Sequence, residues 1–527
     1  RLPRILASST SILLHSRLLI RDGASRCRFF TMGPPVTAPS TATPSSSVPA
    51  GPLRVPEGVR GMTKLDKDLF STEITFPTIA ISARDVSRVR GCTHKFWAKN
   101  LGKIKPVMED PESPEKRILV FNPNLVQDEE TRDRLLSTAQ SVLDNTTLEW
   151  SERKLTVDFS CWDTRSMFRA VLPDGMDYSS YTQTGHLIHC NFRDELIPYR
   201  HIIGEILLNK ISNCRTVVLK PDVIKTVYRT LDVELIAGEP DYIVETVEDG
   251  LRFKMDFTKV FWNSRLSQEH LRVRKHIGKN SLVFDACAGI GPFALPALKK
   301  SHARLILAND LNPDSVYWMQ ENIRLNKIKD DAITIYNKDA VSFLRGEVAR
   351  ILREEALLPV EKRPSDAHII MNLPAMATEF LPAFRGLLRS GEKGDDIPSE
   401  MIKSKPFDVI VYCYLFAKAH EDVPDSWYAE RALHMVKEKL KDDDVVIRSA
   451  HEVRGVSSRK FMYCVECIIS WSHLLAEPLQ STTEKNGSVK LFRENADGEN
   501  VEETETQRKE ETDEPKEKKA KLDGPAD

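Results

Sequence analysis

The stretch "FDACAGIGPFALPALKK", residues 284–300, decides the fold of this chain. An apolar run ends in an acid, the chain turns through two glycines, and an amphipathic helical pattern follows. This order of strand, glycine loop and helix is typical of a cofactor loop in an α/β protein. Gly289-x-Gly291-x-x-Ala294 also fits the Ala-ending form of the dinucleotide fingerprint, so the glycines alone leave the cofactor open.

Residues 263–478 alternate strand-like apolar runs with amphipathic helical patterns. This rhythm predicts a parallel sheet covered by helices on both faces, which is the α/β class of fold. A nearly continuous apolar run at 407–416 has the composition of a strand that is buried on both faces. Ligands of such sheets bind outside the carboxyl ends of the strands. Four runs end there in polar residues: Asp285, Asp310, Asp339 and Asn372.

Two residues beside the glycines distinguish between the candidate cofactors. Pro292 follows the second glycine and removes a backbone donor that a pyrophosphate would need at a helix N-terminus. Asp285 places a carboxylate where it would repel pyrophosphate but suit the cationic amine and sulfonium of S-adenosylmethionine. Asp310, 19 residues after Gly291, can accept the ribose hydroxyls of either cofactor and does not discriminate. The pattern favours S-adenosylmethionine over a dinucleotide.

Asn372-Leu373-Pro374 is the next informative element, because it follows an apolar run directly. The amide oxygen and a backbone carbonyl at a strand end can accept hydrogen bonds from the N–H edge of a base. Such a pair would hold a ring nitrogen toward a methyl group. A plain polar turn between a strand and a helix is the alternative.

The rest of the 527 residues divides by composition. An Arg- and Ser-rich, acid-poor segment predicts a mitochondrial presequence, with untargeted leader sequence as the alternative. Low-complexity sequence predicts disorder in a linker and a charged tail. We expect a presequence at 1–31, a linker at 32–61, an N-terminal domain at 62–176, a middle α+β domain at 177–262, the α/β domain at 263–478 and a tail at 479–527.

Composition also limits the class of protein. Hydrophobic residues at 41% and charged residues at 29% are ordinary for a globular chain, and the net charge of −2 argues against general nucleic-acid coating. No window approaches twenty apolar residues, so no membrane span is expected. The nine cysteines lie at irregular spacing, which indicates free thiols in a reducing compartment. Cys464-x-x-Cys467 is a weak candidate for a zinc or redox pair.

The two ends bear on localisation. The presequence predicts the mitochondrial matrix, whereas a shorter form that starts at Met32 would lack it. The tail contains "PKEKKAKL" at 515–522, a candidate nuclear-import patch. We therefore expect mitochondrial, nuclear and cytoplasmic pools.

Four stretches, taken together, resemble one family: "FWNSRLSQEHLR", "FDACAGIGPFALP", "ANDLNPDSVYWMQENIRLNKI" and "IIMNLPAMATEFLPAF". They are similar to the archaeal and eukaryotic tRNA (guanine-N1-)-methyltransferases that act at guanosine 37, beside the anticodon. The resemblance implies a class I, Rossmann-like methyltransferase domain with its last strand antiparallel, and two smaller N-terminal α+β domains. It also implies S-adenosylmethionine, a tRNA with G37 that an N-terminal tRNA-recognition domain at 62–176 contacts, a monomer, and magnesium without an assigned protein ligand. Reading-frame maintenance and a second substrate, inosine 37, follow from the same resemblance.

The resemblance also assigns site residues. Glu269 corresponds to the general base that takes the N1 proton of guanine, and Arg229 to the arginine that faces O6. Positions for base and substrate contacts are Asn372, Pro374 and Arg265. Positions for the cofactor are His270, Asp285, Gly289, Gly291, Asp310, Leu311, Asp339, Ala340 and Asn372.

Other interpretations stay open at this level. Glu269 could form a helix-surface salt bridge to Arg265, four residues earlier. The related aminocarboxypropyl transferase of tricyclic-guanosine synthesis would share the fold, and a catalytically idle RNA-binding module is a further alternative. Residues 84–105 carry seven basic side chains around Phe96 and Trp97, which suits either a phosphate-contacting surface or a solvated helix over a buried aromatic. The loop at 386–407 has no assigned role.

Overall fold

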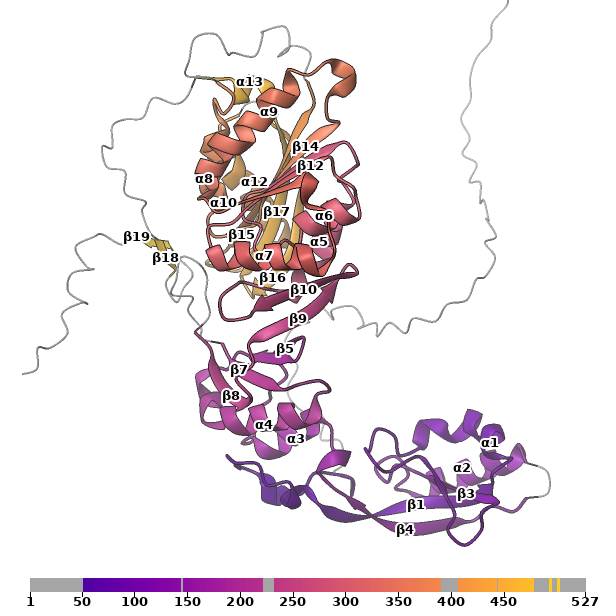
Figure 1. The fold of residues 1–527 in the computed structure, drawn as a ribbon. Helices are drawn as coiled ribbons and strands as arrows, with labels where there is room; N and C mark the ends of the chain where they lie inside the picture. Colours follow the sequence, from indigo (N-terminus) through magenta and orange to yellow (C-terminus); the bar gives the residue numbers. More distant parts are fainter. Residues whose placement is uncertain are drawn as a thin grey trace, which may run out of the picture. The chain divides into compact units, whose positions relative to one another are not determined.

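The computed structural model describes residues 51–143, 146–220, 232–389, 406–442 and 444–477, with the backbone of 492–494 and 500–502 (Figure 1). Several predictions lie outside these residues. They are the presequence, most of the linker, the nuclear-import patch, Arg229 and most of the 386–407 loop. In the part of the chain that the structure describes, no helix is long and apolar enough to cross a membrane.

A seven-stranded sheet forms the centre of the α/β domain. Its order is β13-β12-β11-β14-β15-β17-β16, with parallel pairing from β13 through β15 and antiparallel pairing of β17 with both neighbours. The predicted parallel sheet with an antiparallel last strand is therefore confirmed. The strands are β11 Ser281–Asp285, β12 Leu305–Asn309, β13 Ile333–Tyr336, β14 Asp366–Met371, β15 Asp408–Lys418, β16 Val446–Ser457 and β17 Lys460–Ile469.

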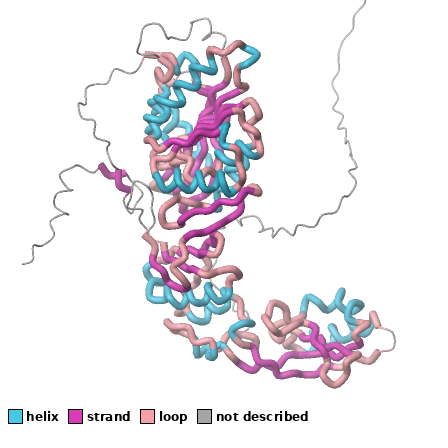
Figure 2. The backbone as a smooth tube through the Cα atoms, in the orientation of Figure 1, coloured by secondary structure: helices cyan, strands magenta, loops and turns pink. Residues whose placement is uncertain are grey.

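Helices cover both faces of this sheet, as Figures 1 and 2 show. One face packs against α5 Ser267–Arg274, α6 Ala294–Lys299 and α7 Pro313–Leu325. The other packs against α8 Ala340–Phe343, α9 Ala349–Ala356, α10 Ala377–Phe380 and α12 Asp425–Leu440. Burial on both faces is the reason that β15 reads as one apolar run.

Local sequence signals set the ends of the helices that follow β11 and β12. Asn312 caps α7 by accepting a hydrogen bond from the backbone N–H of Asp314, and Pro313 occupies the first helical position, as predicted. Pro296 is the third residue of α6. A proline is tolerated there because the first N–H groups of a helix have no intrahelical acceptor.

Three smaller sheets precede the α/β domain in the described part of the chain. One four-stranded sheet has the order β2-β3-β1-β4, and a second has the order β5-β6-β7-β8. Their strands are β1 Thr72–Ser82, β2 Val107–Glu109, β3 Lys116–Val120, β4 Trp150–Val157, β5 Tyr181–Thr184, β6 Leu187–Cys190, β7 Thr216–Leu219 and β8 Glu234–Gly238. Their helices are α1 Val86–Thr93, α2 Glu129–Ser141, α3 Thr164–Val171 and α4 Arg200–Lys210.

The third is a hairpin of β9 Ile243–Glu248 and β10 Leu251–Asp256, which is fastened to α7. The backbone N–H groups of Arg252 and Lys254 donate to the side chains of Asn326 and Asn322, at 2.8 and 2.7 Å. This hairpin therefore shares its core with the seven-stranded sheet. The positions at which the sequence is predicted to divide into domains stay predictions.

Cys464 and Cys467 are both free and buried in β17. They belong to the cores on opposite faces of the sheet, because residues three apart on a strand point to opposite sides. The two sulfurs therefore do not form a shared metal or redox site.

Candidate functional site

The two loop glycines serve different purposes. Both have a positive φ, 56° at Gly289 and 94° at Gly291, which favours glycine at each position. A Cβ on Gly291 would lie 2.8 Å from Cγ of Leu295, whereas a Cβ on Gly289 would meet nothing within 4 Å. Gly291 thus permits close packing of the loop on its helix, and Gly289 leaves open space at the strand ends, where a ligand can approach.

Asp310 and Asn309 fasten this loop to the neighbouring strands. The Asp310 carboxylate accepts hydrogen bonds from the backbone N–H groups of Gly289, at 2.7 Å, and Asn312, at 2.9 Å. Burial raises the pKa of Asp310, although these two donors oppose the rise. Asn309, which the sequence did not single out, bonds the backbones of Ala286 and Lys338 and so ties three strand ends together.

Asp285 is the most deeply buried acid of the loop. It is 0% exposed, and burial raises its pKa to about 8, with a smaller contribution from Asp310 and opposition from the backbone N–H of Cys287. Its Oδ2 has no hydrogen-bond partner among the described residues. A standing negative charge was expected here, but burial favours the neutral form of this carboxyl group. An adjacent cation would favour ionisation and occupy the free oxygen, so the site fits the charged end of S-adenosylmethionine.

Other predicted cofactor and base positions lie along the same carboxyl edge of the sheet. Leu311 is 44% exposed, Ala340 is buried, and Asp339 caps α8 by accepting from Ser342, so the local role of Asp339 is structural. Asn372 and Pro374 are half-buried just after β14. Oδ1 of Asn372 is a buried acceptor without a partner in the described part of the chain, which suits a donor from a ligand.

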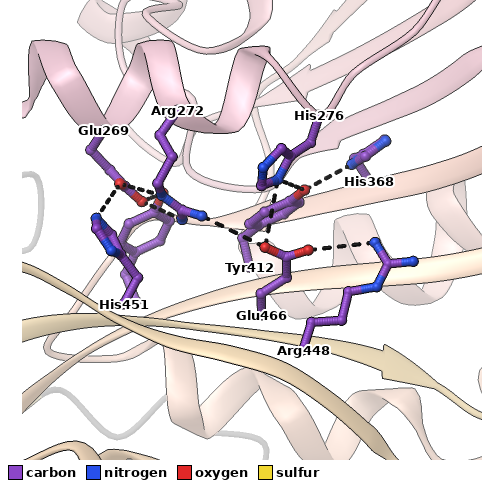
Figure 3. Close-up of polar contacts among 9 residues, drawn as sticks. Glu269, Arg272, His276, His368, Tyr412, Arg448, His451 and Glu466 are labelled. Atoms are coloured by element: carbon purple, nitrogen blue, oxygen red, sulfur yellow. Dashed lines mark hydrogen bonds and ion pairs between the residues drawn. The ribbon is translucent and has the colours of Figure 1, made fainter. Parts of the chain in front are cut away.

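Glu269 does not lie on an exposed helix surface. It is only 4% exposed, and its partner is Arg272 rather than Arg265 (Figure 3). Arg272 donates from Nε to Oε2 at 2.7 Å and from Nη2 to Oε1 at 2.8 Å, while the hydroxyl of Tyr414 donates to Oε1 at 2.7 Å. The alternative of a surface salt bridge to Arg265 is therefore wrong, and Arg265 itself is exposed.

These donors decide the charge of the Glu269 carboxylate. Burial alone would raise its pKa, but the hydrogen bonds from Arg272 and Tyr414 and the charge of Arg272 hold the pKa below its usual value. Arg272 is itself held by the buried Glu466 of β17, at 3.6 Å, and Glu466 also contacts Arg448 and His276. Figure 3 shows this network running from α5 across β15, β17 and β16. Glu269 is thus an ionised carboxylate in a fixed position.

His270 connects this helix to the glycine loop. Its Nδ1 lies 2.5 Å from Oε1 of Glu248, and its ring meets the ring of Phe293 edge-on at 4.6 Å. Phe293 in turn contacts the ring of Tyr414 at 6.0 Å. Nε2 of His270 is buried without a partner among the described residues. The structure therefore places Glu269 and the glycine loop at one site.

The register of the sheet explains why these side chains lie at one site. Met371 pairs with Cys413, so Tyr414 is level with Asn372, and Tyr414, Cys464 and His451 form one row across β15, β17 and β16. Arg272, Tyr414, His451 and Glu466 were missed from the sequence. Only Arg272, three residues after Glu269, had a local signal.

The sheet order and the loop at its carboxyl edge define a class I methyltransferase fold. Residues 244–393 match the TRM5/TYW2 methyltransferase domain, and residues 164–241 match the TYW2 N-terminal domain. The tRNA (guanine(37)-N(1))-methyltransferase of Caenorhabditis elegans is 48% identical, covering 82% of this chain and 93% of the relative. That of Homo sapiens is 34% identical, covering 78% and 76%. The chain belongs to the tRNA (guanine(37)-N(1))-methyltransferase family.

A solved structure of aTrm5 in complex with tRNALeu has the same fold. It is 21% identical, has a TM-score of 0.50, and covers 74% of this chain and 99% of that chain.

Proposed function

We propose that this chain transfers the methyl group of S-adenosylmethionine to N1 of guanosine 37 in tRNA. The observation that carries the proposal is Glu269, a buried carboxylate that is held ionised beside the glycine loop. Guanine N1 bears a proton and is a poor nucleophile until a base removes it. A positioned carboxylate is such a base.

The residues of the chain divide the work. S-adenosylmethionine, when bound, supplies an activated methyl group. Asp285, Asp310 and the open side of Gly289 would hold it at the ends of β11 and β12. The free Oδ1 of Asn372 would accept a hydrogen bond from the base, and Glu269 would take the N1 proton. Arg229, assigned by the resemblance to guanine O6, would stabilise the charge that develops there.

A base in a stacked loop must leave its neighbours to reach this buried carboxylate. The unstacking cost is a few kcal/mol, and it is smallest for bases that are already unpaired. Position 37, in the anticodon loop, meets that condition. The basic side chains of residues 84–105 are exposed, flank the buried Trp97 in the sequence, and would contact phosphates in a salt-dependent way.

Incubation with labelled S-adenosylmethionine and unmodified tRNA tests the proposal. We expect label on tRNA with G37 and none on the matched tRNA with A37, with the added mass of one methyl group at N1. Equal methylation of the A37 transcript would contradict the proposal.

A second candidate is the transfer of the aminocarboxypropyl group of the same cofactor. The match of residues 164–241 to the TYW2 N-terminal domain favours it. The mass of the modified nucleoside distinguishes the two reactions, because an aminocarboxypropyl group adds much more mass than a methyl group. The names of the Caenorhabditis elegans and Homo sapiens relatives favour methyl transfer.

We also propose a monomer, magnesium dependence, and pools in the mitochondrial matrix, nucleus and cytoplasm. The described residues contain no group of three or more His, Cys, Asp or Glu side chains that could hold a metal. We propose that magnesium binds with the phosphates of the RNA substrate rather than at the cofactor site. Chelation should then slow methyl transfer without weakening binding of S-adenosylmethionine.

Fluorescent fusions of the full chain and of a form starting at Met32 would test the localisation.

A further inference from the structure

A buried base needs a route by which the accepted proton can leave. Glu269 is 4% exposed, so water has little direct access to its carboxylate. If the proton stayed there after methyl transfer, the carboxylate would not be ready for another substrate. The groups that contact the carboxylate therefore determine how it is reset.

Most of these neighbours cannot accept a proton. Arg272 is a permanent cation, and its pKa is raised further despite its burial by the bond to Glu269. Burial raises the pKa of the Tyr414 hydroxyl and of the Cys464 thiol far above neutrality, so both groups keep their protons. Glu466 is separated from Glu269 by Arg272, which contacts both carboxylates.

His451 is different. Its Nε2 lies 3.4 Å from Oε2 of Glu269 (Figure 3). Because its side chain is 43% exposed, the ring joins the buried carboxylate to solvent. Oε2 is also the oxygen with fewer donors, since it accepts from Arg272 alone while Oε1 accepts from Arg272 and Tyr414. Among the described residues that contact this carboxylate, His451 alone offers a basic nitrogen.

We propose that His451 relays the proton from Glu269 to water and so resets the base. The inference rests on the proposed function of Glu269. As the N1–H bond breaks, its electron pair forms the bond from N1 to the methyl carbon, whose bond to sulfur breaks with the pair staying on sulfur. The proton passes to Oε2 of Glu269, then to Nε2 of the neutral imidazole. The imidazolium releases a proton to water.

The surroundings favour this direction of transfer. The groups that face His451 and its partner are Arg272 from α5, Tyr414 from β15 and Cys464 from β17, and of these only Arg272 is charged. Arg272 stabilises the ionised form of Glu269, so the carboxylate readily gives up its proton. Glu466 anchors Arg272 from behind and fixes the carboxylate relative to the ring.

Single-turnover and multiple-turnover methyl transfer by His451→Ala test the relay. We expect multiple turnover to fall by about 10²-fold, because proton transfer by a positioned side chain contributes about that much, while the first turnover falls less. Imidazole in the buffer should restore much of the rate to His451→Ala. His451→Gln keeps a polar contact but accepts no proton, so it should be as slow as the alanine variant.

His434→Ala is the matched control, because His434 lies 3.6 Å from Glu438 in an exposed pair on α12, against the other face of the sheet. It should retain the wild-type rate. Binding of S-adenosylmethionine and melting temperature should be unchanged in all three histidine variants.

Two outcomes separate the hypotheses. The relay is wrong and the base assignment stands if Glu269→Gln is inactive but His451→Ala keeps the wild-type turnover. The same conclusion follows if Glu269→Gln is inactive and His451→Ala is slow but is not restored by imidazole. If Glu269→Gln is as active as wild type, the base assignment itself is wrong, and the relay with it.

Discussion

Two buried acids of the same site have pKa values that are shifted in opposite directions. Asp285 at the end of β11 is completely buried with one weak backbone donor at 3.4 Å, and its pKa rises to about 8. Glu269 on α5 is almost as buried, yet its pKa is lowered because Arg272 and Tyr414 donate three hydrogen bonds to it. Burial alone therefore does not set the charge of a carboxylate; the donors around it do.

The difference suits the two tasks. An acid that becomes charged only beside a cation can recognise a cationic cofactor. A base must be ionised before its substrate arrives. Substitutions of each acid, and of a donor to Glu269, should reveal this division of tasks.

Glu269→Gln should have the largest effect. The amide keeps the shape and burial but cannot take the N1 proton, so we expect single-turnover methyl transfer to fall by about 10²- to 10⁴-fold. Binding of S-adenosylmethionine, measured by calorimetry, should change little. Glu438→Gln on the exposed face of α12 is the matched control, and a similar loss there would argue against a specific role for Glu269.

Asp285→Asn should change the stability of the ligand-free protein as well as the binding of the cofactor. Because the folded-state pKa of Asp285 is raised to about 8, its protonated form stabilises the fold fully below pH 4, and this contribution is lost as the pH rises toward 8. The ligand-free asparagine variant should therefore gain stability relative to wild type across this range, with an upper limit of about 6 kcal/mol. Denaturant unfolding at several pH values measures it.

Cofactor binding offers a second measurement of the same residue. A cation beside Asp285 favours its ionisation, so binding of S-adenosylmethionine at pH 7 should release a proton from wild type but not from Asp285→Asn. Calorimetry in buffers of different ionisation enthalpy detects the release. Asp163→Asn is the control, because Asp163 caps α3 outside the site and its pKa is lowered, despite partial burial, by its bonds to Ser166. Equal proton release from wild type and Asp285→Asn would contradict the assignment.

Tyr414→Phe should have the smallest effect and sharpen the comparison. It removes one of three donors, so the pKa of Glu269 rises, and activity should be lost at a higher pH than in wild type as the solution is acidified. A hydrogen bond to a charged group contributes about 1.5–3 kcal/mol, so the acid limb should move by roughly 1–2 pH units. Tyr463→Phe, which loses a long contact to Glu452, should leave the pH–rate profile unmoved.

Much of the fold was accessible from the sequence because its signals are local. The apolar run of β15, the Asn312 and Pro313 start of α7 and the glycine loop each depend on residues a few positions apart. The parallel sheet and the polar strand ends followed from these signals. The charge of Asp285 did not, since burial, which follows from packing, reverses its preference.

The sequence by itself determined the sheet, the loop and the residues at the carboxyl ends of the strands. Only the tertiary structure decided how Glu269 is charged and what contacts it. Its donor Tyr414 is 145 residues away, and His451 lies still farther along the chain on β16. The physical reason is the strand order: β17 inserts between β15 and β16 and brings Tyr414, Cys464 and His451 into one row beside α5. No pattern of neighbouring residues encodes that row.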